Sequence, residues 1–467
     1  MSKKGFLEYS DVPIISNDNL MPLPQGSIAI RPIDSIEKND GTYNINFDFQ
    51  RLENNLSKAL DLDIQFCSHC RDLIEIAIVL YYADQYHDYA PGMEEEQDPW
   101  AKLWSRELNF RLSISHPEFF SRYIKELVDL AEFVLNEESD FSFFAKKTKF
   151  LKEGTYTNGF DRLILVSGGI DSFAAALNYG NSKTIFLSIN RGSNRKEQKA
   201  VGDFLARAFG DLVHISPLIQ STQAPKITKP ELILQHRVRI SNIMSRSILY
   251  LSYASVIAHH LNIPEILIAD NGIVSYNLSV SAGRQHTKTT HPITLFLFQK
   301  AIRAIFPSLG LRIINPFIHS TKSEEIGIIK RNNALSAIKS TNSCFNPRKK
   351  NMHCGQCYGC LIRRISILAT GNAEHDADYA FNAFSPQTKI QRNKPGRRLL
   401  IDIILMTKKI RTSSKSELAS SYPILFDDRL SYKSLNRVYK LYGRFYKELE
   451  KAVQRAGDEQ LRKLMRE

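Results

Sequence analysis

The chain has 467 residues, 43% of them hydrophobic and 24% charged, which is the composition of an ordinary globular protein. This length predicts two or three domains, and the composition excludes a disordered chain, a collagen-like chain and a small disulfide scaffold. No apolar run approaches the ~20 residues that cross a bilayer, and the first residues lack the apolar segment of a secretory signal. We therefore expect a cytoplasmic protein with no membrane partner.

Residues 1–155 have the pattern of a small α/β domain. Alternating apolar and polar residues predict strands and helical spacing predicts helices, the strands at 28–33, 43–49 and 108–114 and the helices at 72–86 and 123–136. The same region contains Cys67 and Cys70. One C-x2-C pair supplies only half of a zinc site, so we expect two reduced, partly buried thiols.

A strand, a glycine turn and a helix are predicted at residues 163–177. The turn consists of Ser167, Gly168, Gly169, Ile170, Asp171 and Ser172. Its glycines let backbone N–H groups approach phosphate oxygens, while the serine hydroxyls and the helix N-terminus add further donors. A bare carboxylate would repel phosphates, so Asp171 predicts a bridging Mg²⁺ ion. No Gly-Lys-Ser/Thr follows, which excludes a Walker A loop.

This S-G-G-x-D-S loop resembles the motif of the N-type ATP pyrophosphatases, or PP-loop enzymes, which have the adenine nucleotide alpha hydrolase-like fold. Members cleave ATP to AMP and pyrophosphate while they adenylate a carboxylate, amide or carbonyl group. The resemblance implies a doubly wound parallel sheet with the loop at the C-terminal edge of its first strand. That location agrees with the general position of ligand sites in open α/β sheets.

Four of the six cysteines fall within 17 residues, at Cys344, Cys354, Cys357 and Cys360. In a large chain without a signal segment this spacing favours a metal site over disulfides. Four thiolates can enclose Zn²⁺ in a closed tetrahedron, which predicts a structural site with no open catalytic position. An iron–sulfur cluster is the alternative. His353 could replace one thiolate, although its place next to Cys354 makes convergence awkward.

The cysteine run continues to Arg363 as C-x9-C-G-x-C-x2-C-x2-R, which is similar to 7-cyano-7-deazaguanine synthase (QueC), whose cysteines hold structural zinc. The helical stretch 246–254 and the stretch 315–326 resemble further QueC elements, so the resemblance covers about residues 160–368. Arg246, Lys322 and Arg363 are basic residues in otherwise apolar or neutral contexts. Each is a candidate to bind the α-phosphate or the charge of an acyl-adenylate, and the alternative for each is a surface ion pair.

Two segments depart from the synthase pattern. Residues 190–195 replace its Y-G-Q-R-H run, and residues 270–277 and 284–292 stand where its Y-P-D-C-R run is missing. With the long N-terminal extension, these segments resemble the diverged QueC-like proteins of antiphage systems: QatC of the Qat system and the QueC-like component of type IV CBASS. That resemblance implies 7-deazaguanine chemistry directed at a partner protein of a defence operon. Our candidate substrate residues are Asn271, Arg284, His291 and Arg363, and for His291 the alternative is a cap on a helix at 293–305.

The last 80 residues carry most of the net charge of +13. From Thr388 to Glu467 there are 20 basic and 9 acidic side chains. Such a basic region is an electrostatic match for an acidic partner, of which nucleic acid is the commonest. The alternative is a solvated helical face whose interspersed aromatic side chains pack inward.

The sequence thus predicts an N-terminal α/β domain (1–155), a QueC-like PP-loop domain with a zinc knot (156–372) and a basic helical region (373–467). The predicted activity is ATP-dependent adenylation of a 7-carboxy-7-deazaguanine-type carboxylate, followed by transfer of the acyl group to nitrogen. Asp171, Arg246 and Lys322 are the candidate catalytic residues. The alternatives are a housekeeping 7-cyano-7-deazaguanine synthase, a tRNA-modifying PP-loop enzyme and a nucleotide-binding adaptor without turnover.

Overall fold

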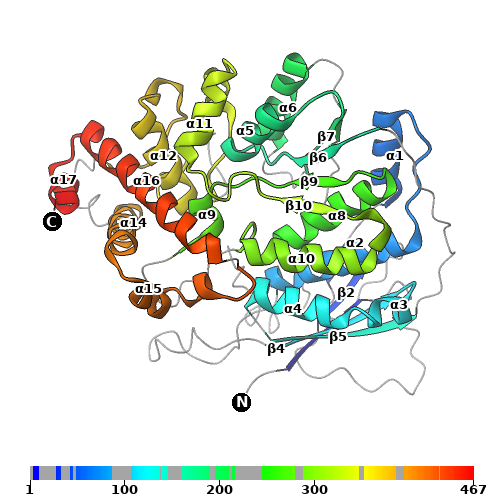
Figure 1. The fold of residues 1–467 in the computed structure, drawn as a ribbon. Coiled ribbons are helices and arrows are strands. Elements are labelled where there is room, and N and C mark those ends of the chain that lie inside the picture. Colours follow the sequence, from blue (N-terminus) through cyan, green and yellow to red (C-terminus); the bar gives the residue numbers. More distant parts are fainter. Residues whose placement is uncertain are drawn as a thin grey trace, which may run out of the picture.

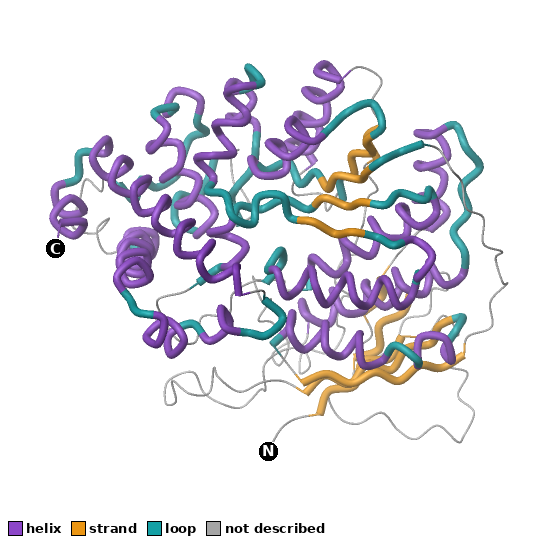
Figure 2. Tube along the Cα trace, viewed as in Figure 1, coloured by secondary structure: helices purple, strands orange, loops and turns teal. Residues whose placement is uncertain are grey.

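The structure is a computed structural model that describes residues 4–9, 28–32, 43–45, 49–86, 107–136, 138–145, 159–189, 195–209, 213–215, 245–278, 288–345, 352–384, 394–430 and 432–466. Within these ranges no helix is both long enough and apolar enough to span a membrane. The ordered elements form two parallel sheets and several layers of helices (Figures 1 and 2).

The N-terminal sheet has five parallel strands in the order β3-β2-β1-β4-β5. The strands are β1 (Lys4–Tyr9), β2 (Ile28–Pro32), β3 (Tyr43–Ile45), β4 (Glu107–Ile114) and β5 (Glu138–Ala145), and the helices of this region are α1 (Phe49–Leu60), α2 (Ser68–Tyr86), α3 (Pro117–Ser121) and α4 (Ile124–Leu135). The predicted α/β character is confirmed, but β1, β5 and α1 were missed. The predicted strand 43–49 is too long: Phe49 begins α1, which buries Leu52 and Leu56 one turn apart.

The second sheet contains five parallel strands in the order β10-β9-β6-β7-β8. Its strands are β6 (Arg162–Leu165), β7 (Thr184–Leu187), β8 (Val213–Ile215), β9 (Glu265–Leu267) and β10 (Arg312–Ile314). The chain moves outward from β6 in one direction and then returns to build the other side. This is doubly wound topology, and its strand order reverses between β6 and β9, where open sheets of this kind bind ligands.

Helices cover both faces of the second sheet. They are α5 (Ile170–Tyr179), α6 (Arg195–Phe209), α8 (Arg246–His260), α10 (Pro292–Ile305) and α11 (Lys322–Arg331), whereas the short helix α9 (Gly272–Tyr276) packs with the C-terminal helices. Strand β6 shows why helices are needed on both faces of the sheet: its alternate apolar side chains project to opposite faces and pack into different hydrophobic cores. Leu163 and Leu165 join the core that contains α8 and α10, whereas Ile164 packs with α5 and α11.

The two sheets share one hydrophobic core. Helices α2, α4, α8 and α10 lie between them (Figure 1), and side chains from all four helices belong to the same buried cluster. Cys67 and Cys70, at the start of α2, form no disulfide, as predicted; they are fully buried, where we expected partial burial, and their sulfurs are 3.0 Å apart. The N-terminal region therefore packs directly against the second sheet.

The C-terminal region is helical, as predicted. After α12 (Tyr358–Thr370), which belongs to the predicted second domain, this region comprises α14 (Pro395–Thr412), α15 (Lys415–Ser421), α16 (Tyr432–Ala456) and α17 (Glu459–Arg466). Helix α16 packs against α9, α12 and α14, and the aromatic side chains that the sequence scatters among its cations are buried there, namely Tyr442, Phe445 and Tyr446. The aromatic residues thus pack inward and are not a stacking surface for bases.

Candidate active site

The S-G-G-x-D-S loop lies between the end of β6 and the start of α5. Gly168 has a φ of +83°, and a Cβ atom there would come within 2.9 Å of the Gln198 backbone nitrogen, so glycine is required on both counts. The Ser167 N–H donates to Ser172 Oγ at 3.2 Å, and Ser172 Oγ donates to the Gly169 carbonyl at 3.2 Å. These bonds hold the loop in a tight turn over the first-turn N–H groups of α5, which is the geometry of an anion site.

Asp171 is buried beneath this loop and is held by two other segments of the chain. Its Oδ1 accepts from the backbone N–H and the side-chain amide of Asn271, at 2.9 and 2.7 Å, and its Oδ2 accepts from Lys322 Nζ. Burial alone would raise the pKa of Asp171, but Lys322 lowers it to about 2. Burial would likewise depress the pKa of Lys322, and Asp171 raises it instead. The floor of the loop is therefore an ion pair with no net charge.

This ion pair offers a second explanation for Asp171, for which we predicted a Mg²⁺ ion that bridges its carboxylate and the phosphates. The carboxylate is neutralised by Lys322 and fully engaged with Asn271, so no cation is needed to explain a carboxylate at this position. Asn271, expected to touch substrate, instead orients Asp171 and accepts from the Val274 N–H to cap α9.

Two further carboxyl groups complete the cluster, and sequence reasoning gave neither a role. Burial and the neighbouring Asp171 raise the pKa of Glu325 well above its ordinary value. Burial and Asp171 also raise the pKa of Asp270, to about 6. Asp270 follows β9 at the sheet edge where the order reverses, and that position after an apolar strand was the available signal.

Asp270 is anchored by a polar network from β10, α9 and the turn before α10. Its Oδ2 accepts from Thr290 Oγ1 at 2.9 Å, and its backbone carbonyl accepts from Asn315 Nδ2 at 2.8 Å. Ser275 Oγ lies 2.9 Å from both Thr290 Oγ1 and Asn315 Nδ2. The network holds Asp270 half-buried after β9, where the charge of Arg246, at the start of α8, offsets a small part of the rise in the pKa of Asp270 that burial causes.

The remaining candidate substrate residues have different outcomes. His291 caps α10, with Nδ1 accepting from the Ile293 N–H at 3.2 Å, so the capping alternative is correct. Burial lowers the pKa of His291 to about 3, and its Nε2 is buried without a partner among the described residues. A neutral ring whose Nδ1 accepts carries its proton on Nε2, which leaves one donor available. Arg284 lies outside the described residues.

Arg363 is structural, contrary to our expectation of a substrate contact. It is completely buried in α12, and its Nε donates to Asp376 Oδ1 at 2.8 Å. Its terminal nitrogens donate to Thr341 and to the Ile338 carbonyl, between 2.8 and 3.1 Å. These bonds use four of its five N–H groups, and the side chain has no exposed surface, so the structure gives the guanidinium no route to a ligand. Its function is to tie α12 to the segment 338–341.

The four predicted cysteines converge. The sulfurs of Cys344, Cys354, Cys357 and Cys360 all lie within 4.8 Å of one another, and no other such group occurs in the described ranges. The Cys354–Cys360 and Cys344–Cys357 sulfurs are 3.8 and 4.0 Å apart. Tetrahedral zinc with Zn–S bonds of ~2.3 Å requires sulfurs ~3.8 Å apart, so the group fits Zn²⁺. His353 is not among these ligands, because its Nε2 accepts from the Ser343 N–H.

The segment that carries Cys344 connects the cysteine site to the phosphate loop. The Asn342 N–H donates to the Gly168 carbonyl at 2.8 Å, and the Asn342 carbonyl lies so close to Gly169 that a Cβ atom there would come within 3.1 Å of it. The metal site and Arg363 fix this segment from opposite ends. The cysteines thus hold part of the wall of the loop and supply no open coordination position.

Comparisons with known proteins agree with this geometry. Residues 161–370 match the family model of the queuosine biosynthesis protein QueC. The chain is similar to 7-cyano-7-deazaguanine synthases of Syntrophus aciditrophicus (26% identical, over 45% of this chain and 93% of the relative), Picrophilus torridus (27%, 46% and 90%) and Rickettsia bellii (27%, 46% and 97%). The range matched by the family model contains the second sheet and the cysteine site. Residues 161–370 are a QueC-like domain, which implies an ATP-using, C–N bond-forming enzyme.

Proposed function

We propose that this protein adenylates the carboxylate of a 7-carboxy-7-deazaguanine-type base and transfers the resulting acyl group to a nitrogen nucleophile. The observation that carries the proposal is the Asp171–Lys322 pair beneath an anion loop, in a domain similar to 7-cyano-7-deazaguanine synthases. A floor without net charge, lined by N–H and hydroxyl donors, suits the pyrophosphate of ATP. Catalysis then consists of positioning and electrostatic stabilisation, since adenylation itself supplies the leaving group.

Each residue receives a role from its place in the site. Ser167, Ser172 and the N–H groups of 168–170 bind the pyrophosphate, and Lys322 keeps the buried Asp171 ionised and in place. Arg246 lies near Asp270 and faces the charge of the adenylate. Mg²⁺ accompanies ATP in an enzyme of this class, and Asp270 is the carboxylate that fits it, since a half-buried oxygen is the kind of hard ligand that Mg²⁺ takes beside its waters. The His291 Nε2–H is the candidate donor to the base.

The reaction balances without a redox partner. A carboxylate oxygen of the base attacks the α-phosphorus of ATP, the bond to the β-phosphate oxygen breaks, and pyrophosphate leaves. An amine then attacks the acyl carbon, and AMP and one proton leave as the C–N bond forms. The product is an amide, and activation of that amide by a second ATP would give a nitrile.

We further propose that the acceptor is an amino group of a partner protein in an antiphage system. The support is the departure of residues 190–195 and 270–292 from the synthase pattern and the presence of flanking regions that the synthases lack. A housekeeping synthase would use ammonia as the acceptor. The two acceptors give products of different mass, so one assay separates them.

The test is release of AMP from α-labelled ATP, with and without 7-carboxy-7-deazaguanine, in the presence of ammonium. We expect AMP formation that depends on the base and equals pyrophosphate in amount. AMP formed only with tRNA, and not with the free base, would contradict the proposal in favour of a tRNA-modifying enzyme. ATP binding without AMP under every condition would favour an adaptor. Mass spectrometry of candidate partner proteins from the same reaction identifies the acceptor.

A further inference from the structure

One side of α16 carries an unbroken row of cations. Arg437, Lys440, Arg444, Lys447 and Lys451 recur at alternating intervals of three and four residues. That spacing places them on one face of the helix, about 5–6 Å from one to the next. From the first to the last the row extends about 21 Å, at about 1.5 Å per residue. We call these five residues the α16 cation row.

Most of the row is available for an external partner. Arg444 forms an ion pair with Glu324 at 2.9 Å, whereas Lys440 and Lys447 are exposed and have no ion-pair partner in the part of the chain that the structure describes. Arg437 and Lys451 are exposed as well. Five like charges on one helix face repel one another, and the carboxylates near them, Glu324, Glu448 and Glu450, are fewer than the cations, so the row favours binding of a polyanion.

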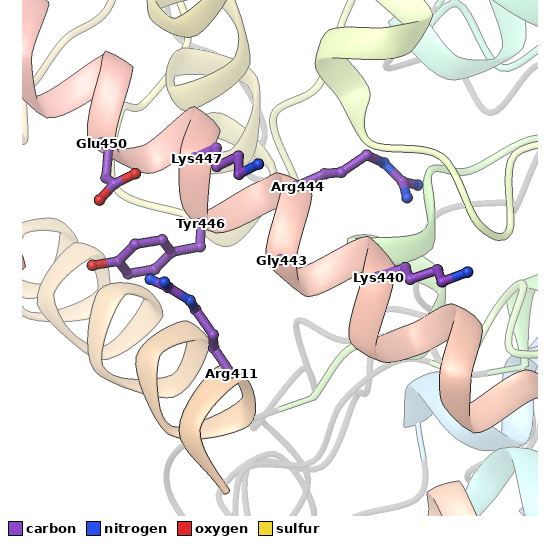
Figure 3. A pocket seen from close by; sticks show the side chains of 7 residues that line it. All are labelled: Arg411, Lys440, Gly443, Arg444, Tyr446, Lys447 and Glu450. Carbon is purple, nitrogen blue, oxygen red and sulfur yellow. The ribbon is translucent and has the colours of Figure 1, made fainter.

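The row borders a groove of about 400 Å³ between α16 and α14, lined by Arg411, Lys440, Gly443, Arg444, Tyr446, Lys447 and Glu450. In Figure 3, Lys440, Arg444 and Lys447 extend from α16 in the same direction, and Arg411 rises from α14 towards Tyr446. The Arg411 guanidinium lies 4.4 Å from the centroid of the Tyr446 ring. Gly443 leaves open space at the helix surface, with no atom within 4 Å of the position of a Cβ.

We propose that the α16 cation row binds the sugar–phosphate backbone of a double-stranded nucleic acid. The regular spacing and the length of the row match a linear array of phosphates, and about six base pairs span the same length at about 3.4 Å per pair. Tyr442, Phe445 and Tyr446 of α16 are buried, and Tyr439 is half-buried with its hydroxyl donating to the Ser413 carbonyl, so no fully exposed aromatic ring stands beside the row among the described side chains of α16. Single strands are bound by stacking on exposed aromatic rings, so the duplex is the form that fits.

The same observations disfavour an acidic protein surface. Protein interfaces are centred on apolar and aromatic anchors, whereas five of the seven residues that line this groove are charged. The row also begins beside the proposed ATP site. Arg444 contacts Glu324 in the first turn of α11, whose first residue is Lys322, and the charge of Arg437 opposes the rise in the pKa of Tyr276 of α9 that burial causes. A bound duplex would therefore lie next to the proposed ATP site.

The experiment measures binding by the full chain of fluorescent duplexes of about 20 base pairs, one of DNA and one of RNA, by anisotropy over a range of salt concentrations. No ATP or deazaguanine is added, so the result is independent of the proposed reaction. We expect binding whose log Kd rises with log salt at a slope of about 4, from four unpaired cations at about 0.9 each. The DNA and RNA arms identify which duplex is preferred.

Gly443 allows the charge to be tested without removing a contact. In Gly443→Glu a carboxylate enters the open space amid the cations, and we expect affinity for the duplex to fall about tenfold. Gly443→Gln has the same size without the charge and should change affinity less than about twofold. Lys447→Ala should reduce the salt slope by about 1. Lys183→Glu, at an exposed residue just before β7, is the remote control and should leave binding unchanged.

Three results would overturn the proposal. The first is binding without salt dependence, or no binding at all. The second is an equal loss in Gly443→Glu and Gly443→Gln, because the groove would then recognise shape and not charge. The third is tighter binding of a single strand, or of polyglutamate, than of the duplexes, which would assign the row to a stacking ligand or to an acidic protein.

Discussion

Replacing Lys322 by methionine removes one charge from the floor of the phosphate loop and keeps a side chain of similar length. In the structure Lys322 Nζ is the cation bound to the buried carboxylate of Asp171, and both side chains are almost inaccessible to water. The substitution leaves Asp171 with Asn271 as its donor and with Glu325, another acid, beside it. We expect a large loss of stability whose size can be worked out from the pair itself.

Two separate arguments give similar magnitudes for this loss in the free energy of unfolding. The pKa of Asp171 is lowered from 3.8 to about 2, and at about 1.4 kcal/mol per unit this shift is worth about 2 kcal/mol above pH 4. Breaking a buried ion pair by removing one partner costs about 3–5 kcal/mol. We therefore expect the free energy of unfolding of Lys322→Met to fall by about 3 kcal/mol at neutral pH, or by about 3 °C in melting temperature for a chain of 467 residues that unfolds as one unit.

The loss should also depend on pH. A lowered carboxyl pKa stabilises the fold at pH values above the unfolded pKa, and this contribution disappears as pH falls towards the folded pKa. In Lys322→Met, burial raises the pKa of Asp171 instead, so the carboxylate is a penalty that protonation relieves. The difference in stability between wild type and variant should thus be larger at pH 8 than at pH 5.

Chemical denaturation of four proteins measures the effect: wild type, Lys322→Met, Asp171→Asn and the double variant. Lys330→Met, an exposed cation on the same helix, is the matched control and should change stability by less than about 0.5 kcal/mol. The double variant should regain most of the stability of Lys322→Met, because no charge is left unpaired. It should nevertheless release no AMP. A loss below about 1 kcal/mol in Lys322→Met, or no recovery in the double variant, would refute the reasoning.

Three other predictions follow from buried groups. Arg363→Met leaves the Asp376 carboxylate with Arg364 alone and should cost about 3 kcal/mol in a denaturation experiment, whereas Arg364→Met, at a partly exposed partner, should cost about 1 kcal/mol. Burial raises the pKa of Glu448 from 4.5 to about 7. Wild type should therefore lose stability as pH rises between these two values, because the buried carboxyl group then has to ionise. Glu448→Gln should be about 2 kcal/mol more stable than wild type at pH 8. Cys344→Ser should lower bound zinc and raise the KM for ATP, measured by elemental analysis and by AMP release.

Each of these three predictions would be contradicted by a specific result. Equal losses in Arg363→Met and Arg364→Met would mean that burial does not distinguish the two guanidiniums. A stability of Glu448→Gln that follows wild type at every pH would assign the pH dependence to other groups. Zinc below about half an equivalent in wild type, with no iron, would refute the metal site. A zinc-depleted Cys344→Ser with an unchanged KM would separate the cysteines from the phosphate loop.

Local pattern was enough to predict several parts of this protein. The apolar strand, the Gly-Gly turn and the alanine-rich helix at 163–177 are contiguous in sequence, so their periodicity and turn chemistry predicted the loop, and the structure shows them as β6 and α5. The four cysteines lie within one short segment, where spacing alone limits the geometry. The inward packing of the α16 aromatic residues follows from helical spacing in the same way.

The tertiary structure decided what distant residues do to one another. Asp171 and Lys322 are 151 positions apart, and neither local pattern indicates that they form an ion pair. The sequence alone therefore predicted a Mg²⁺ ion as the partner of Asp171. Arg363 looked like a ligand for phosphate because its partners, Asp376 and Thr341, meet it only when α12 packs. The charge and chemical type of a residue can be read from the sequence at one position. Its burial and its hydrogen-bond or ion-pair partners depend on which distant residues the fold packs around it. The fold determined which cations are used within the protein and which, on α16, face the solvent.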